Sequence, residues 1–164
     1  MNMEAIEAMK ATPTHNNMPL RLADFSTLAE ALDYAAQGET GFNFYTGTGK
    51  LHSVLPYAKL REQAQTLARR LHSLGLDRGA RVALVADTTP DFHIFFFACQ
   101  YAGLIPVPLT ASIHLGGHQA YVEQLRRLLT TCQAEVAMAP ADFLPFLSEA
   151  AEGVNLRFAG GPEA

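Results

Sequence analysis

The chain has 164 residues, of which 49% are hydrophobic and 17% are charged, and its formal net charge is -4 at pH 7. This length is typical of one domain and allows folding to bury about 70% of the surface that the unfolded chain exposes. The excess of acidic residues argues against a nucleic-acid partner, because a generally acidic surface repels phosphate. The composition therefore predicts a globular domain with no nucleic-acid partner.

Residues 1–23 predict a flexible N-terminal arm, and residues 24–164 a folded domain. The arm carries acidic residues near its start, a polar centre at residues 12–17, and no apolar segment of the kind found in signal peptides. The most hydrophobic segment, residues 94–109, is shorter than the roughly 20 residues of a membrane span and is interrupted by glycine and proline. No membrane span is therefore expected.

Two cysteines, Cys99 and Cys132, each fall within a predicted helix. A secreted protein would favour pairing them, but the sequence gives no sign of secretion. Both are expected to be reduced, buried thiols of a cytoplasmic protein.

The first half of the domain predicts a helix, a β-hairpin and a second helix. A capping box at Thr27 and Glu30 begins a helix that Gly38 ends. Short strands at residues 41–45 and 51–55 are joined by a turn-rich connection. After Pro56, apolar residues recur at spacings of three and four, which predicts an amphipathic helix. Its solvated face carries Lys59, Arg61, Glu62, Arg69 and Arg70.

The middle of the chain predicts a parallel βαβ unit. Residues 81–86 are an apolar run bounded by turn residues, which is typical of a buried strand. Thr89 is placed to cap a helix and Pro90 to occupy its first position. This helix, which continues to Ala102, is apolar on most of its circumference and is expected to lie inside the protein. Residues 104–109 then form a strand whose two prolines place it at least partly at a sheet edge.

Strand and helix continue to alternate after this unit. The expected elements are a loop at 110–118, an amphipathic helix around 121–129, a strand at 134–139, a helix at 141–151 and a strand at 155–158. The sequence therefore predicts an α/β fold, a three-layer sandwich with a largely parallel sheet.

Two short motifs are similar to known sites but lack required residues. The run Thr46–Lys50 resembles a phosphate loop, but Phe44 and Leu51 stand where that loop needs glycine and a hydroxyl residue. A hairpin turn is the better interpretation. His114 and His118 have helical spacing, but two glycines separate them and no Glu or Cys accompanies them, so no metal site is expected.

The remaining histidines, aromatic residues and arginine pairs are interpreted as structural. His52, His72 and His93 have no motif partner. Four phenylalanines of the apolar helix could line a lipid pocket, but packing of the helix on the sheet explains them without a ligand. They are Phe92, Phe95, Phe96 and Phe97. The pairs at 69–70 and 126–127 are expected on solvated helix faces.

Several motifs, taken in order, resemble the opening of the adenylate-forming ligases, which include acyl-CoA synthetases, nonribosomal adenylation domains and luciferases. The order begins with Tyr-x-x-Leu at Tyr57, followed by Gly-x-x-x-Gly-x-x-Val at residues 75–82. It continues with Ala-Gly at 102–103 and ends with Val-Pro at 107–108. The only departure is Ala80, where the family usually has Asp.

Within that family the chain is most similar to the fatty acyl-AMP ligases. The motif Phe-Phe-x-Cys-x-Tyr-Ala-Gly at residues 96–103 and the helix at 121–129 favour this branch. The resemblance covers about residues 25–164 and implies the N-terminal subdomain of the adenylate-forming ligase fold. It also implies a role for the complete enzyme in fatty acid activation, lipid metabolism, or polyketide or lipopeptide biosynthesis.

The resemblance implies that a complete enzyme joins ATP and a fatty acid into an acyl-adenylate, with Mg2+ assisting, and passes the acyl group to an acyl carrier protein. The family's phosphate loop, adenine-side segment, ribose-binding Asp and catalytic Lys would lie beyond Ala164. A truncated chain of this kind is expected to be inactive alone. No residue is therefore assigned a catalytic, cofactor-binding or metal-binding role.

Two alternatives stay open. The chain could be a stand-alone, non-catalytic binding or docking module with a ligand crevice at the carboxyl ends of its strands, in the loops after Ala86 and Leu109. It could also be a degenerate fragment with a structural role. A self-contained module should melt cooperatively as a monomer, whereas a severed subdomain should self-associate or bind a hydrophobic dye.

Overall fold

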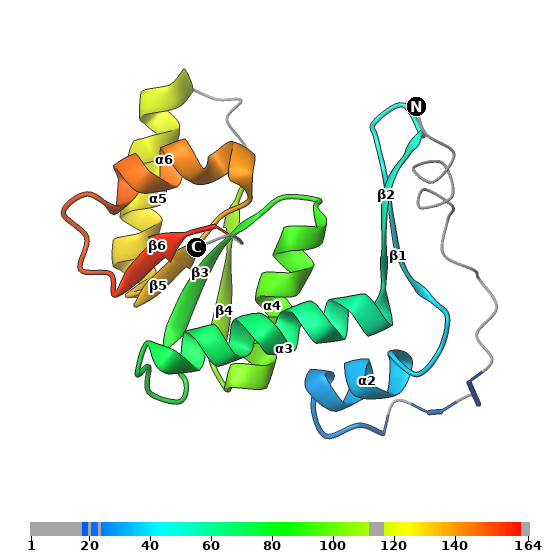
Figure 1. Ribbon diagram of the computed structural model, residues 1–164. Helices are drawn as coiled ribbons and strands as arrows, with labels where there is room; N and C mark the ends of the chain where they lie inside the picture. The colour runs from blue at the N-terminus through cyan, green and yellow to red at the C-terminus, as the bar shows by residue number, and fades with distance from the viewer. Residues whose placement is uncertain (1–17, 20, 23, 112–116, 162–164) are drawn as a thin grey trace.

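The computed structural model describes residues 18, 19, 21, 22, 24–111 and 117–161 (Figure 1). Most of the predicted arm at residues 1–23 lies outside the described residues. So do His114 and the centre of the predicted loop at 110–118. The division into an arm and a domain therefore stays a prediction.

The predicted alternation of helices and strands is present in the structure. The elements in chain order are α2 (Leu28–Ala35), β1 (Gly41–Tyr45), β2 (Leu51–Pro56), α3 (Tyr57–Ser73), β3 (Arg81–Ala86), α4 (Pro90–Ala102), β4 (Ile105–Thr110), α5 (Gly117–Cys132), β5 (Val136–Met138), a 3-10 turn (Ala141–Phe143), α6 (Leu144–Ala151) and β6 (Phe158–Gly160).

Four strands form a fully parallel sheet in the order β4-β3-β5-β6. Successive side chains of a strand point to opposite faces, so each strand contributes to two cores. Val82 and Leu84 pack with α3 and α4 on one face. Ala83 and Val85 pack with α5 and α6 on the other face. The helices thus form two outer layers around the sheet, which confirms the three-layer sandwich (Figure 1).

The face on which each crossover helix packs depends on the direction of the step from one strand to the next. The step from β3 to β4 passes through α4, whose buried side chains belong to the α3–α4 face. The steps from β4 to β5 and from β5 to β6 run in the opposite direction and pass through α5 and α6 on the other face. This is the arrangement that right-handed crossovers require.

Strand β4 lies at one edge of the sheet, as its prolines predict. The backbone N–H of Ile105 donates to the carbonyl oxygen of Ala80, on the β3 side, at 2.9 Å. Because direction alternates along a strand, Pro106 and Pro108 point their nitrogens at the open edge. Neither proline therefore removes a hydrogen bond from the sheet.

The predicted hairpin forms a separate two-stranded antiparallel sheet. It projects beside the N-terminal end of α3, away from the parallel sheet (Figure 1). Gly41 is paired with Pro56, and Phe42 with Leu55. The ring of Phe42 lies 4.4 Å from that of His93 on α4, between ring centroids. Aromatic contacts therefore attach the base of the hairpin to the α3–α4 layer.

Asp33 joins three helices through one carboxylate oxygen. Arg61 Nε on α3 lies 2.6 Å from Asp33 Oδ1 on α2, and the hydroxyl of Tyr101 on α4 donates to the same oxygen at 2.7 Å. Burial alone would raise the pKa of Asp33, but hydrogen bonds from Arg61 and Tyr101 and the Arg61 charge outweigh it and lower this pKa. Burial, together with the Asp33 contact, raises the pKa of Tyr101 to about 12.

Replacing Asp33 with Asn is expected to reduce stability in a pH-dependent way. The folded-state pKa of Asp33 lies below its usual value of 3.8, so the ionised carboxyl stabilises the fold above that value and loses this effect as pH falls through the folded pKa. Because the ion pair is almost half exposed, the loss at pH 7 should be about 0.5–1 kcal/mol. Urea unfolding at pH 7, 5 and 3 measures the difference, which should shrink between pH 5 and 3.

The exposed Asp77, replaced in the same way, is the control. It makes no comparable bridge between helices, so the substitution should change stability by less than about 0.5 kcal/mol. An Asp33→Asn loss that stays constant from pH 7 to pH 3 would contradict a role for the ionised carboxyl.

Two predictions about side chains are wrong in part. Arg126 is not solvated, because its Nη2 donates to the backbone oxygen of Glu149 at 2.6 Å and the side chain is partly buried. The Glu149 oxygen, in the last turn of α6, also accepts from the backbone N–H of Glu152 at 3.3 Å, and Arg126 is its second donor. Cys99 is buried as expected, but Cys132 near the end of α5 is only partly buried.

Helix α4 is not enclosed on all sides as its apolar sequence predicts. Only Ile94, Phe95, Ala98 and Cys99 are buried. Three of its four phenylalanines, at positions 92, 96 and 97, remain partly exposed. Within the described residues, nothing covers the outward side of this helix completely.

Several boundaries also differ from expectation. Strand β5 (Val136–Met138) is shorter than the strand expected at 134–139, and the helix expected at 141–151 begins with a 3-10 turn. Helix α5 begins at Gly117, so His118 belongs to the helix and not to the preceding loop. Strand β6 lies at Phe158–Gly160, so it begins three residues and ends two residues later than expected. Its approach is fixed by Arg157, whose backbone N–H donates to the oxygen of Glu135 at 2.7 Å.

Candidate functional site

The tip of the hairpin does not have the geometry of a phosphate loop. The N–H of Thr46 donates to the oxygen of Lys50, and the N–H of Gly49 donates to the oxygen of Thr46. The residues of the tip are exposed, and strand β2 follows them. A phosphate loop instead directs backbone N–H groups at its ligand from the start of a helix. The structure therefore supports the hairpin-turn interpretation.

The described histidines make structural contacts or face solvent. His93 lies between the rings of Phe42 and Phe44, and its Nδ1 is 3.0 Å from the oxygen of Thr89. His118 Nε2 lies 2.8 Å from Glu149 Oε1, which links α5 to α6. His52 and His72 are exposed. Among the described residues, no three His, Cys, Asp or Glu side chains lie close enough together to hold a metal ion.

Strand β3 leads into α4 on one face of the sheet, whereas its neighbours β4 and β5 lead into α5 and α6 on the other face. The carboxyl end of β3 is therefore a topological switch point. Thr89 stands at the N-cap of α4 with extended backbone, as predicted, but makes no side-chain capping bond. Its buried Oγ1 has no hydrogen-bond partner among the described residues. Nearby, the hydroxyl of Tyr121 donates to the oxygen of Thr110 at 2.8 Å. Burial, followed by the charge of Asp87, raises the pKa of Tyr121 to about 12, so this hydroxyl remains protonated.

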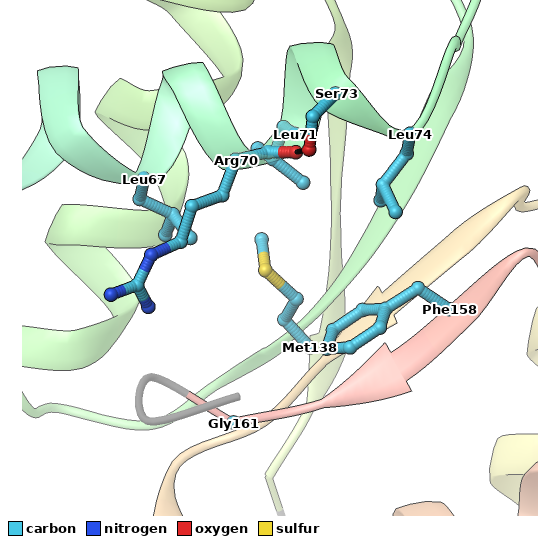
Figure 2. Close-up of a pocket in the computed structure, with 8 residues that line it drawn as sticks. All are labelled: Leu67, Arg70, Leu71, Ser73, Leu74, Met138, Phe158 and Gly161. Atoms are coloured by element: carbon cyan, nitrogen blue, oxygen red, sulfur yellow. Dashed lines mark hydrogen bonds between the residues drawn. The ribbon is translucent and has the colours of Figure 1, made fainter.

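A mainly apolar hollow lies between the C-terminal half of α3 and strands β5 and β6 (Figure 2). We call it the α3–β6 groove, and its volume is about 450 Å³. In Figure 2 the side chains of Met138 and Phe158 lie across the hollow from those of α3, and Gly161 follows the end of β6. The groove is lined by Leu67, Arg70, Leu71, Ser73, Leu74, Met138, Phe158 and Gly161.

A second hollow, of about 480 Å³, lies between α3 and the start of α4. It shares Leu67 and Arg70 with the α3–β6 groove, so the two hollows adjoin along α3. Its walls are more polar and include Lys59, Glu62 and Asp91. The side-chain oxygen of Gln63, which also lines it, is buried without a hydrogen-bond partner among the described residues.

Neither hollow contains a set of groups suited to catalysis. The thiol of Cys99 is not a nucleophile, because burial raises its pKa to about 12. The residues that line the two hollows include no glycine-rich turn to hold the phosphates of ATP, and among the described residues no three carboxylate, His or Cys side chains lie close enough together to hold Mg2+. The α3–β6 groove and the second hollow are thus adjoining surface hollows along α3.

The family model of the AMP-binding enzymes matches residues 32–157. The chain belongs to the AMP-binding enzyme family. A curated relative from Caulobacter vibrioides, a "putative acyl-CoA synthetase", is 47% identical over 149 residues, which are 91% of this chain and 26% of that protein. A 4-hydroxybenzoate--CoA/benzoate--CoA ligase from Rhodopseudomonas palustris is 31% identical over 82% of this chain and 23% of its own length.

A structure solved in work on fatty acyl-adenylate ligases from E. coli and L. pneumophila superposes with a TM-score of 0.80 at 40% sequence identity. The match covers 88% of this chain and 26% of that one. The parallel α/β architecture of this AMP-binding family member corresponds to the N-terminal subdomain of the adenylate-forming ligase fold. The chain spans about a quarter of the length of the relatives that it matches.

Sequence reasoning did not find the two hollows or the Asp33 bridge. Residues 67–74 and Phe158 come from segments more than 80 positions apart, and no local pattern marks their proximity. Asp33 and Arg61 each look like ordinary solvated residues on the faces of their helices. One signal was available: Tyr101 is a hydroxyl residue in a mostly apolar helix, and a partly buried hydroxyl requires a partner.

Proposed function

We propose that this chain is the N-terminal subdomain of a longer ligase that activates a fatty acid with ATP to form an acyl-adenylate and pyrophosphate. The observation that carries the proposal is the superposition on a structure from work on fatty acyl-adenylate ligases, at 40% identity over 88% of the chain. At this identity the likeness extends beyond the fold alone. Since the chain spans about a quarter of its relatives, the reaction belongs to the longer protein.

Under this proposal the described residues build a scaffold beside the site of chemistry. Membership of the AMP-binding family implies ATP-dependent chemistry. ATP would supply the adenylyl group, with Mg2+ offsetting the charge of the phosphates. Because the described residues do not fit either group, both would be held by other parts of the longer chain. The 164-residue chain alone is therefore inactive in this proposal.

The acceptor of the acyl group separates two candidate functions. We propose an acyl carrier protein, in keeping with a fatty acyl-AMP ligase that works in the cytoplasm. Coenzyme A is the second candidate, because the relative at 47% identity is described as a putative acyl-CoA synthetase. Both candidates share the first half-reaction and differ only in the second.

The first test compares the 164-residue chain with the longer polypeptide encoded by the same reading frame. Exchange of labelled pyrophosphate into ATP is measured with a series of fatty acids and with benzoate as a control substrate. The longer polypeptide should show exchange that depends on a fatty acid, and the 164-residue chain should show none. Exchange with benzoate alone would overturn the choice of fatty acid. A reading frame that stops at Ala164 would favour the stand-alone module.

The second test offers the activated acyl group to two acceptors in separate reactions. Mass spectrometry measures acyl transfer to a carrier protein with its phosphopantetheine arm, and to free coenzyme A. Transfer to the carrier protein with little coenzyme A thioester supports the proposal. Efficient formation of acyl-CoA would assign the protein to the second candidate.

A further inference from the structure

A third hollow, of about 400 Å³, lies between the C-terminal half of α3 and the end of α4. We call it the basic hollow, because its two exposed lining residues are Arg69 and His72 and none of its lining is acidic. The other lining residues are less exposed and mostly apolar. The lining residues are Gln65, Ala68, Arg69, His72, Tyr101 and Ala102.

Arg78, in the turn before β3, adds a second guanidinium close to this hollow. A Cβ placed on Gly103 would lie 3.6 Å from Arg78 Cγ and 4.0 Å from its Cζ. Gly103 is the C-cap of α4 and directly follows Ala102 of the lining. The negative end of the α4 dipole attracts a cation at this position, so the Arg78 charge is held near the hollow.

No carboxylate of the described residues offsets these charges. Arg69 Nη2 donates to Thr66 Oγ1 of its own helix at 3.1 Å. Within the described ranges, no ion pair joins Arg69, His72 or Arg78 to an acidic side chain. The basic hollow therefore presents positive charge to solvent.

The neighbouring surfaces are balanced in charge. Arg61 and Arg157 form ion pairs with Asp33 and Glu135, and the second hollow combines two basic with two acidic residues. The chain as a whole carries a net charge of -4. Unbalanced positive charge at the basic hollow is thus a local property, and it would attract and orient an acidic surface.

The proposed reaction has one macromolecular participant besides the ligase. ATP and the fatty acid are small molecules, whereas a carrier protein must present its phosphopantetheine arm by docking through its own surface. The basic hollow has an apolar centre at Ala68 and Ala102 and charges at its rim, which is the usual arrangement of a protein interface.

We propose that the basic hollow, together with Arg78, docks an acidic surface of the acyl carrier protein that accepts the acyl group. The inference rests on the proposed function, because it requires a carrier protein as acceptor. Carboxylates of the carrier protein contact Arg69 and Arg78, and apolar side chains between them contact Ala68 and the ring of Tyr101.

The kinetics of acyl transfer by the longer polypeptide test this inference. Arg69 is exposed, so Arg69→Glu reverses a charge at the hollow without disturbing the core. The KM for an acyl carrier protein bearing its phosphopantetheine arm should rise about tenfold, with kcat changed less than about twofold, because a charge at the rim of an interface acts mainly on association. Raising NaCl from about 50 to about 300 mM should also raise the KM of the unsubstituted enzyme, because salt screens these charges.

Arg69→Gln removes the charge without reversing it and should raise the KM by a smaller factor. Arg127→Glu is the matched control, because Arg127 is an exposed helix arginine on α5, in the opposite layer. It changes the net charge by the same amount, and its KM for the carrier protein should differ less than about twofold from that of the unsubstituted enzyme.

Equal KM values for Arg69→Glu and Arg127→Glu, in an enzyme that acylates the carrier protein, would overturn the inference and leave the proposed function intact. An unsubstituted longer polypeptide that acylates only coenzyme A would overturn the carrier protein as acceptor, and the inference with it.

Other occupants of the basic hollow give different results. If an acidic segment of the longer chain fills it, Arg69→Glu lowers the Tm of the longer polypeptide well below that of Arg127→Glu and leaves the KM for the carrier protein unchanged. If a second copy fills it, the unsubstituted protein sediments as a dimer that Arg69→Glu dissociates. Either result would overturn the inference.

Discussion

The Phe95→Ala variant should lower the free energy of unfolding by about 3–5 kcal/mol. Phe95 on α4 is 0% exposed and packs with Val82 and Leu84 of the central strand. Removing its ring forfeits the transfer free energy and leaves a cavity between helix and sheet that this close-packed core can fill only in part. Urea unfolding followed by circular dichroism measures the loss.

Phe97→Ala is the matched control, since it removes the same ring from the same helix. Phe97 is partly exposed, so its truncation should cost about 1 kcal/mol. Both variants change helix propensity by the same amount. The difference between their unfolding free energies therefore reports the effect of burial alone. If Phe97→Ala proves as costly as Phe95→Ala, the inward orientation of α4 described here is wrong.

The Gly41→Ala variant should destabilise the hairpin and its attachment to α4, at a cost of about 1–3 kcal/mol. A Cβ at this position would overlap the backbone oxygen of Leu55 and the Cα of Pro56 on the paired strand. Both neighbours are backbone atoms, so rotation of a side chain cannot relieve the overlap. The two strands must move apart. The unfolding free energy and the fluorescence anisotropy of a dye attached at the hairpin tip both report this change.

Gly47→Ala is the control within the same hairpin. A Cβ at Gly47 meets nothing within 4 Å, and the backbone there does not need a left-handed conformation. The substitution should change stability by less than about 0.5 kcal/mol. A loss at Gly47 equal to that at Gly41 would show that the effect comes from glycine content in general and not from close strand approach.

Much of the fold was predictable because local chemistry and tertiary packing agree in the central unit. The apolar run at Arg81–Ala86, the proline at the start of α4 and Gly103 at its end indicate strand, helix and stop independently of one another. The edge position of β4 also followed from chain chemistry, since proline cannot donate within a sheet. In these places the residues of a short stretch of sequence are enough to determine its local structure.

The remainder depended on partners far away in the sequence. Arg126 resembles any other exposed helix arginine until α6 brings the Glu149 carbonyl within 2.6 Å. The outward aromatic residues of α4 look like core residues because their hydrophobicity says nothing about whether another element covers them. The α3–β6 groove and the second hollow could not be predicted from the sequence for the same reason, because a concave surface is formed by several elements together.

The two prolines of β4 also govern how copies of this chain can meet. An exposed edge strand normally offers a row of N–H donors to a neighbouring molecule, which promotes aggregation. Pro106 and Pro108 remove two of these donors from the outward side of β4 without weakening its pairing to β3. Edge-to-edge joining of two molecules through β4 is thereby disfavoured. Edge-to-edge pairing of two copies of the 164-residue chain would have to use β6 or the hairpin instead, so only one edge of the parallel sheet is protected against polymerisation.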